Sequence, residues 1–111
     1  MNLIVIFATL SGAMAVGAGA FGAHGAQGDA AEWLKTGAQY QLAHALAALL
    51  AVQLDVRGPA WLFVAGGLIF AGTLYLMALG LPRWLGAITP IGGTLLIGGW
   101  LWLAWAAVRG G

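Results

Sequence analysis

Residues 36–54 read TGAQYQLAHALAALLAVQL, a stretch without formal charge that holds Tyr40, Gln41 and His44 within five positions. Its length is close to the roughly 20 apolar residues that a helix needs to cross a bilayer. The other uncharged stretches of the chain are 1–28, 58–82 and 84–108. Together the four stretches predict four membrane-spanning helices.

The overall composition supports a membrane protein. Of the 111 residues, 62% are hydrophobic and only 6% are charged, whereas a soluble domain has roughly a quarter of its residues charged. Lipid must therefore be the outer solvent. The net charge of +1 gives no basis for a nucleic-acid partner, and the absence of Cys excludes thiolate chemistry.

The pattern predicts an all-α fold, an integral membrane antiparallel four-helix bundle that forms a single domain over residues 1–111. We expect helices at about 3–22, 37–54, 60–80 and 86–108, with a polar segment at about 23–36 between the first two. The very short turn at residues 55–59 makes the second and third helices antiparallel neighbours. Two Lys or Arg residues fall on each side of the membrane, so the positive-inside rule assigns no orientation.

Small residues recur on one face of each predicted helix, where they allow two backbones to approach closely in lipid. The predicted packing glycines are Gly19, Gly22, Gly67, Gly92 and Gly99. At 100° per residue, Tyr40, Gln41 and His44 share a face with three alanines of the same helix. We therefore expect this polar cluster to point into the bundle.

An imidazole within hydrocarbon needs either a hydrogen-bond partner or a functional role. His44 therefore has three interpretations. The first is an interhelical hydrogen bond shared with Gln41, Tyr40, Ser11 or Thr89. The second is haem or metal ligation together with His24. The third is a quinone, lipid-headgroup or proton site.

Three sequence elements are expected at one side of the membrane, namely FGAHG (21–25), YQLAH (40–44) and ITPIGG (88–93). We predict that they converge on one polar pocket, with the His24 and His44 side chains less than about 12 Å apart. The candidate pocket residues are His24, Tyr40, Gln41, His44 and Thr89.

No Asp or Glu lies within any predicted helix, and no Ser–His–Asp arrangement is credible because all three acids are interfacial. A proton-coupled exporter would need an intramembrane acid. We therefore predict no catalytic residue, no metal site and no cofactor in the leading interpretation.

The motifs FGAHG (21–25), YQLAHALA (40–47), FAGTLYL (70–76), ITPIGG (88–93) and GW (99–100) follow one another in order. With these motifs, nearly the whole chain resembles the small four-helix integral-membrane family that includes the bacterial YgdD-like proteins and mitochondrial relatives in animals. The resemblance implies a multi-pass protein of the cell inner (plasma) membrane. It implies no reaction or substrate, because the family has no settled function.

The leading functional prediction is a non-enzymatic accessory, assembly or stabilising factor of a membrane complex. Its expected partners are the lipid bilayer and either a larger membrane protein complex or further copies of the chain. The alternative is a small-molecule site for quinone, lipid headgroup or haem, built on His24 and His44. A pore formed by oligomerisation would need a polar face at a subunit interface, and the sequence pattern does not indicate one.

Overall fold

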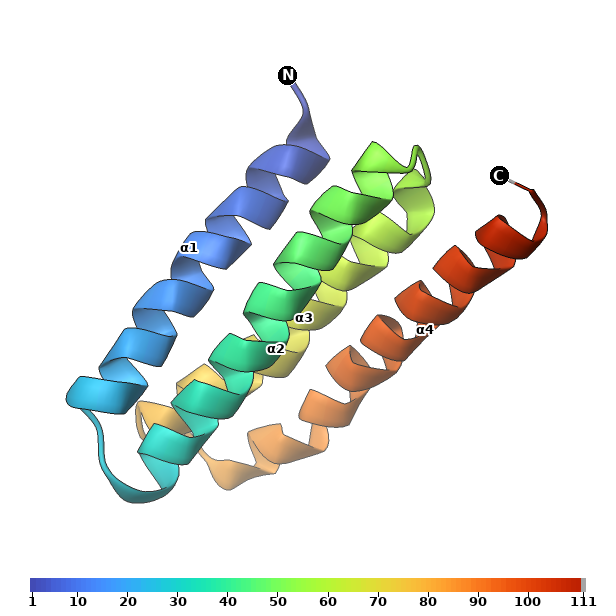
Figure 1. Ribbon diagram of the computed structural model, residues 1–111. Coiled ribbons are helices and arrows are strands. Elements are labelled where there is room, and N and C mark those ends of the chain that lie inside the picture. Colours follow the sequence, from blue (N-terminus) through green and yellow to red (C-terminus); the bar gives the residue numbers. More distant parts are fainter. Residues whose placement is uncertain (111) are drawn as a thin grey trace.

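The computed structural model describes residues 1–110, so residue 111 of the predicted domain lies outside the described part. Its elements are α1 (Leu3–His24), α2 (Gly28–Gln53), α3 (Arg57–Ala78), the 3-10 helix η1 (Arg83–Ala87) and α4 (Thr89–Val108) (Figure 1). Consecutive helices run in opposite directions, and no strand occurs in residues 1–110. The predicted all-α antiparallel four-helix fold is confirmed.

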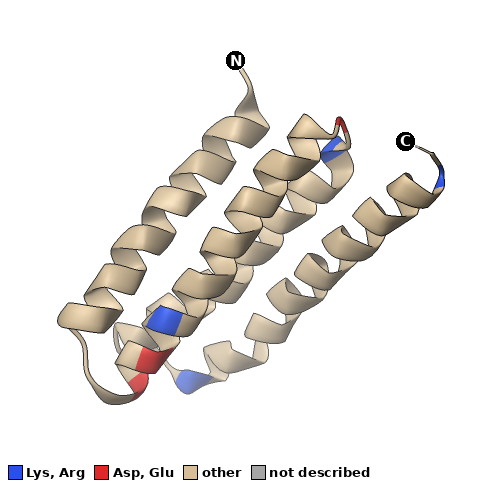
Figure 2. Ribbon diagram, in the orientation of Figure 1, with Lys and Arg blue, Asp and Glu red and all other residues tan. Residues whose placement is uncertain are grey.

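The dimensions and charges of the molecule suit a bilayer. Its longest extent is 47 Å, and a bilayer with its headgroup regions is about 40–45 Å thick. The charged residues gather at the two ends of the helices and leave the middle uncharged (Figure 2). The protein is therefore an integral membrane protein.

Three segments are long and apolar enough to cross a membrane by themselves: α1, α3 and Arg83–Val108. The fourth helix, α2, is not among them, because its Gln, Tyr and His side chains lower its hydropathy. It nevertheless packs along both α1 and α3 and runs beside them (Figure 1). Burial of Gln41 and His44 on its inner side keeps these two polar side chains out of lipid.

The start of α2 differs from the prediction, because the helix begins at Gly28 rather than near residue 37. The polar segment 23–36 is therefore mostly helical. Asp29 lies in the first turn, where a negative charge complements the helix dipole. Ala31 and Leu34 are buried, and Leu34 packs against Gly22 of α1. Tertiary packing thus extends the helix into water beyond its apolar part.

Both α2 and α3 end in the same capping arrangement, one to two residues before the predicted ends. After α3, the Leu81 N–H donates to the Leu76 carbonyl and the Gly80 N–H to the Met77 carbonyl, each at 3.0 Å. This Schellman motif needs a left-handed residue, and Gly80 has a φ of 102°. After α2, Asp55 takes the equivalent position with a φ of 63°.

At the start of α4, the predicted helix from residue 86 is replaced by η1 and then by an α-helix from Thr89. Pro90 lies in the first turn of α4. A proline there loses no helical hydrogen bond, since the first N–H groups of a helix have no intrahelical acceptor. Pro90 therefore sets the start of α4.

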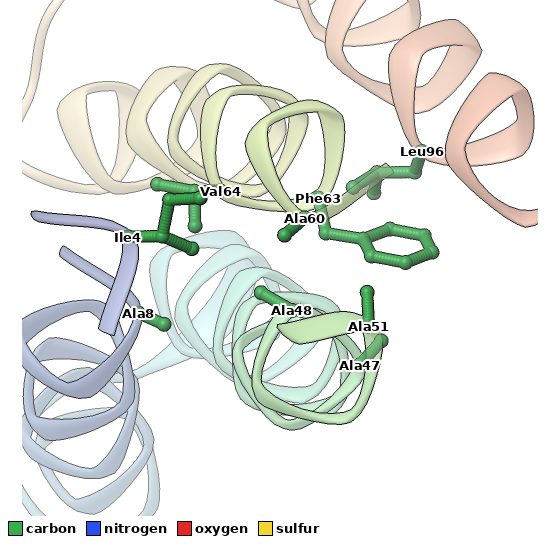
Figure 3. Close-up of a cluster of buried hydrophobic side chains, with 9 residues drawn as sticks. All are labelled: Ile4, Ala8, Ala47, Ala48, Ala51, Ala60, Phe63, Val64 and Leu96. Carbon is green, nitrogen blue, oxygen red and sulfur yellow. The ribbon is translucent and has the colours of Figure 1, made fainter. Parts of the chain in front are cut away.

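The helices are arranged in chain order, with α1 on α2, α2 on α3 and α3 on α4. Helices α1 and α4 lie at opposite edges of the molecule (Figure 1). A cluster of mostly small side chains fills the end of the molecule near the N-terminus (Figure 3). It consists of Ile4, Ala8, Ala47, Ala48, Ala51, Ala60, Phe63, Val64 and Leu96.

Candidate functional site

Gln41 joins three helices by hydrogen bonds. Its side chain is fully buried. The amide nitrogen donates to Ser11 Oγ of α1 at 2.9 Å and to the Met14 sulfur at 3.4 Å. The amide oxygen accepts from the Tyr75 hydroxyl of α3 at 2.7 Å. Donor and acceptor sides of the amide are both used, so the cost of burying it is offset within the protein.

Two glycines lie beside this network, and one of them makes room for it. A Cβ on Gly37 would lie 2.7 Å from the Tyr75 ring, so the ring reaches Gln41 only because residue 37 has no side chain. A Cβ on Gly67 of α3 would lie 4.0 Å from the Gln41 Cα and 4.0 Å from the His44 Cβ. Gly67 therefore faces α2 beside the two polar residues, at ordinary van der Waals distance.

Two hydrogen-bond partners fix the tautomer of His44. The Trp100 indole N–H of α4 donates to His44 Nε2 at 2.9 Å. An indole nitrogen can only donate, so Nε2 carries no proton. Nδ1 lies 2.6 Å from the Tyr40 carbonyl oxygen and must carry the proton that this oxygen accepts. The ring is thus neutral, and both of its nitrogens are engaged.

A groove of about 390 Å³ lies between α2 and α4. It is lined by Tyr40, His44, Gly93, Leu96, Ile97 and Trp100. Aromatic rings keep the two helices apart: Phe70 of α3 lies 4.6 Å from the Tyr40 ring, and Phe63 lies 4.9 Å from the Trp100 ring, between centroids. The His44–Trp100 bond is the side-chain hydrogen bond that bridges α2 and α4 in residues 1–110.

Tyr40 lies at the open edge of this groove rather than in the core. Its side chain is 46% exposed, although the helical projection places it on the inner face. Its backbone carbonyl bonds His44, and its hydroxyl takes part in none of the hydrogen bonds found in residues 1–110. The groove therefore presents a free phenol beside a neutral imidazole.

The structure brings together two of the three elements that were expected to converge. YQLAH and ITPIGG meet where Tyr40, His44 and Gly93 line the same groove. Thr89 bonds Thr73 of α3 at 2.6 Å, one turn before the groove. These contacts follow from α4 packing across α3.

His24 does not join them, so the predicted three-way convergence is wrong. It is exposed at the last residue of α1. His44 lies sixteen residues after the start of α2 at Gly28, a rise of roughly 24 Å. The extra helical turns before residue 37 carry His44 away from the end that holds His24. The two histidines cannot bind one haem iron, and no group of three potential metal ligands occurs in residues 1–110.

Two residues of the site were not identified from the sequence. Tyr75 falls two turns after Gly67, so helical projection places it near the packing face of α3. Trp100 follows the packing residue Gly99, but an abundance of Trp in a membrane protein also fits an interfacial belt. Its side chain was thus not assigned to the core network.

The fold and site define a small multi-pass membrane protein with a hydrogen-bonded core. The family described as Protein of unknown function (DUF423) matches residues 18–93, and the chain belongs to this family. It is 41% identical over 120 residues to the UPF0382 membrane protein SAB0533 of Staphylococcus aureus (strain bovine RF122 / ET3-1), covering 98% of both chains. It is 38% identical over 122 residues to the UPF0382 membrane protein YwdK of Bacillus subtilis (strain 168), again covering 98% of both. No solved structure matches it significantly.

Proposed function

We propose that the protein is a non-enzymatic accessory, assembly or stabilising factor of a membrane complex. The observation that supports this proposal is that the polar groups of the core are engaged in hydrogen bonds within the fold. Gln41 bonds Ser11 and Tyr75, and both nitrogens of His44 are engaged. Side chains committed to holding helices together are not free to act on a substrate. The protein then contributes an apolar packing surface to a complex within the membrane.

We place the protein in the cell inner (plasma) membrane as a multi-pass protein. Proteins of bacterial outer membranes are closed β-barrels, whereas this chain is helical. The relatives in Staphylococcus and Bacillus are named membrane proteins. Fractionation of membranes from a bacterial host tests this placement, and recovery in the soluble or outer-membrane fraction would contradict it.

Isolation from native membranes tests the accessory role. The tagged chain is extracted in a mild detergent at native expression level, and a stoichiometric membrane partner is expected to co-purify. Deletion of the gene should lower the amount of that partner complex, and the wild-type chain should restore it. Tyr40→Phe should restore it equally, since it removes only a hydroxyl that takes part in no hydrogen bond among the described residues 1–110. Recovery of the chain alone from several detergents, with no change in any complex on deletion, would overturn the proposal.

A second candidate is a small-molecule site in the α2–α4 groove, and the unbonded Tyr40 hydroxyl favours it. A hydroxyl facing hydrocarbon without a partner is costly. A quinone carbonyl or a lipid headgroup oxygen could accept its hydrogen bond, while Leu96 and Ile97 contact the apolar part of the molecule. The haem version of this candidate loses its basis because His24 and His44 lie apart.

Filling the groove tests this second candidate. A Cβ on Gly93 would meet the Phe70 ring at an ordinary 3.7 Å, so Gly93→Leu adds bulk to the groove without a backbone clash. The matched control is Gly17→Leu on α1, where a Cβ has open space. Mass spectrometry of co-purified lipids and quinones should show a bound species that Gly93→Leu loses and Gly17→Leu keeps. Equal lipid and quinone content in all three proteins would exclude the site.

A further inference from the structure

The outward side of α2 carries a regular stripe of exposed side chains. It consists of Gln39, Ala43, Leu46 and Leu50, and all four side chains are exposed. Their spacing alternates between four and three residues, and the repeat of 3.5 residues is that of helices paired in a left-handed crossing. We call these four residues the outer stripe.

Gln39 is the unusual member of the outer stripe. Its amide takes part in none of the side-chain hydrogen bonds found in residues 1–110, whereas Gln41, two residues later, uses both sides of its amide. A lone glutamine is thus exposed on a lipid-facing surface. Grooves lie on both sides of it, one toward α1 and one toward Tyr40, so no neighbouring helix covers it.

The depth of Gln39 makes this exposure costly. Ala45 of α2 packs opposite Gly12, close to the middle of α1, and therefore marks the approximate midplane. Gln39 lies six residues from Ala45, a rise of roughly 9 Å. The hydrocarbon core extends about 15 Å from the midplane. The backbone at Gln39 is thus within hydrocarbon, where an amide needs a protein partner in place of water.

We infer that the outer stripe is the interface of a parallel homodimer in which Gln39 of one copy bonds Gln39 of the other. An amide is both donor and acceptor, so two of them satisfy each other across a twofold axis. When both copies insert in the same direction, the twofold axis runs along the membrane normal and places equal residues at equal depth. Opposite insertion would separate the two amides by roughly 18 Å in depth. A foreign helix would have to supply a polar group at this level, whereas a second copy supplies it by symmetry.

The rest of the outer stripe fits this pairing. Ala43 follows Gln39 by one turn and is small, so the two backbones can approach closely beside the amide pair. Leu46 and Leu50 then pack against their counterparts toward the other membrane surface. The interface uses a face of α2 that the fold leaves free, and it requires no rearrangement of the four helices.

Cysteine cross-linking tests the interface directly, because the chain has no native Cys. Ala43→Cys places one thiol on the outer stripe. Ala65→Cys places one on the exposed side of α3, two residues from Gly67, which faces Gln41 and His44 of α2. Each variant is purified alone, reconstituted in phosphatidylcholine vesicles and oxidised mildly. We expect a disulfide-linked dimer with Ala43→Cys and little with Ala65→Cys. Equal cross-linking of both, or none with Ala43→Cys, would overturn the inference.

Removing the amide tests its specific role. In vesicles, Gln39→Leu should weaken dimerisation about tenfold, as measured by energy transfer between labelled copies at increasing lipid dilution. Gln39→Asn keeps an amide and should weaken dimerisation less than Gln39→Leu does. The substituted side chain is exposed, so the thermal stability of the monomer should stay unchanged. Undiminished association of Gln39→Leu would contradict the amide pair. Because these measurements use only the purified chain, their outcome is separate from whether a larger complex exists.

Discussion

The two sides of α2 meet their neighbouring helices in different ways. Toward α1, a Cβ on Gly22 would lie 2.9 Å from the Leu34 Cβ and one on Gly19 would lie 3.3 Å from the Ala38 Cβ. On that side Gln41 is completely enclosed. Toward α4, aromatic rings separate the helices, and His44 reaches Trp100 across a groove. One helix therefore carries both a closed contact and an open one.

The difference shows how residue size controls access to polar groups in a membrane protein. Lipid supplies no hydrophobic force between helices, so the side chains at each contact set the distance. Small residues toward α1 close the contact and commit Gln41 to structure. Large rings toward α4 hold it open and leave the Tyr40 hydroxyl accessible. Four substitutions, taken from the largest expected effect to the smallest, test this comparison.

The largest effect is expected from Gly92→Ala in the close contact of α4 with α3. The new Cβ would lie 2.8 Å from the Gly66 carbonyl oxygen and 2.9 Å from the Phe70 Cα, so backbone must move. We expect a loss of about 3 kcal/mol in the free energy of unfolding, measured by steric trapping in bicelles. Gly93→Ala faces the groove and should change stability by less than about 0.5 kcal/mol. Equal losses at the two positions would show that α4 is no closer to α3 at Gly92 than at Gly93.

A smaller loss is expected when the core amide is removed. Gln41→Leu leaves Ser11 and Tyr75 without their partner, at a cost of about 2 kcal/mol in the free energy of unfolding. The same substitution at Gln39, on the exposed side of α2, should change the stability of the monomer by less than about 0.5 kcal/mol. Both are measured by steric trapping at a lipid dilution that keeps the chain monomeric. If Gln41→Leu were harmless, the buried network would not stabilise the fold.

Loss of the bridge across the groove should cost less again. Trp100→Phe keeps an aromatic ring near Phe63 and removes the hydrogen bond to His44, with an expected loss of about 0.6 kcal/mol. Nitrogen NMR of the imidazole should show a proton on Nδ1 in both proteins, because the Tyr40 carbonyl still accepts it, and a shifted Nε2 resonance in the variant, because Nε2 has lost its donor. Trp105→Phe, at an exposed position, is the control and should leave the Nε2 resonance unchanged. A wild-type ring that carries its proton on Nε2 would contradict the bridge.

The smallest effect is expected at the helix ends. Arg83 of η1 pairs with Asp29 of α2 at 3.0 Å, and their side chains are 75% and 67% exposed. Arg83→Ala should lower the unfolding free energy by less than about 1 kcal/mol, because water and salt screen an exposed pair. A double-mutant cycle with Asp29→Asn, repeated at high salt, measures the coupling. A coupling of several kcal/mol would mean that this pair, and not packing on α3, holds α4 in place.

Much of the core could be predicted from the sequence, whereas the groove at its edge and the start of α2 could not. Helical projection places Gln41 and His44 inward, and both are buried. Projection treats all inward positions alike, so it cannot show that Tyr40 borders a groove. The start of α2 at Gly28 depends on Ala31 and Leu34 packing against α1. Those contacts between distant residues also decide how far His44 lies from His24.

The sequence by itself determined that lipid surrounds the protein, and it also determined the number of helices, their antiparallel order and the polar face of α2. These properties follow from hydropathy, charge position and helical period, which are local quantities. Only the tertiary structure decided that Tyr75 and Trp100 are the partners of Gln41 and His44, that His24 stands apart and that α2 and α4 enclose a groove. The physical reason is that interhelical distance depends on which small and large side chains oppose each other, and that pairing exists only after the helices have packed.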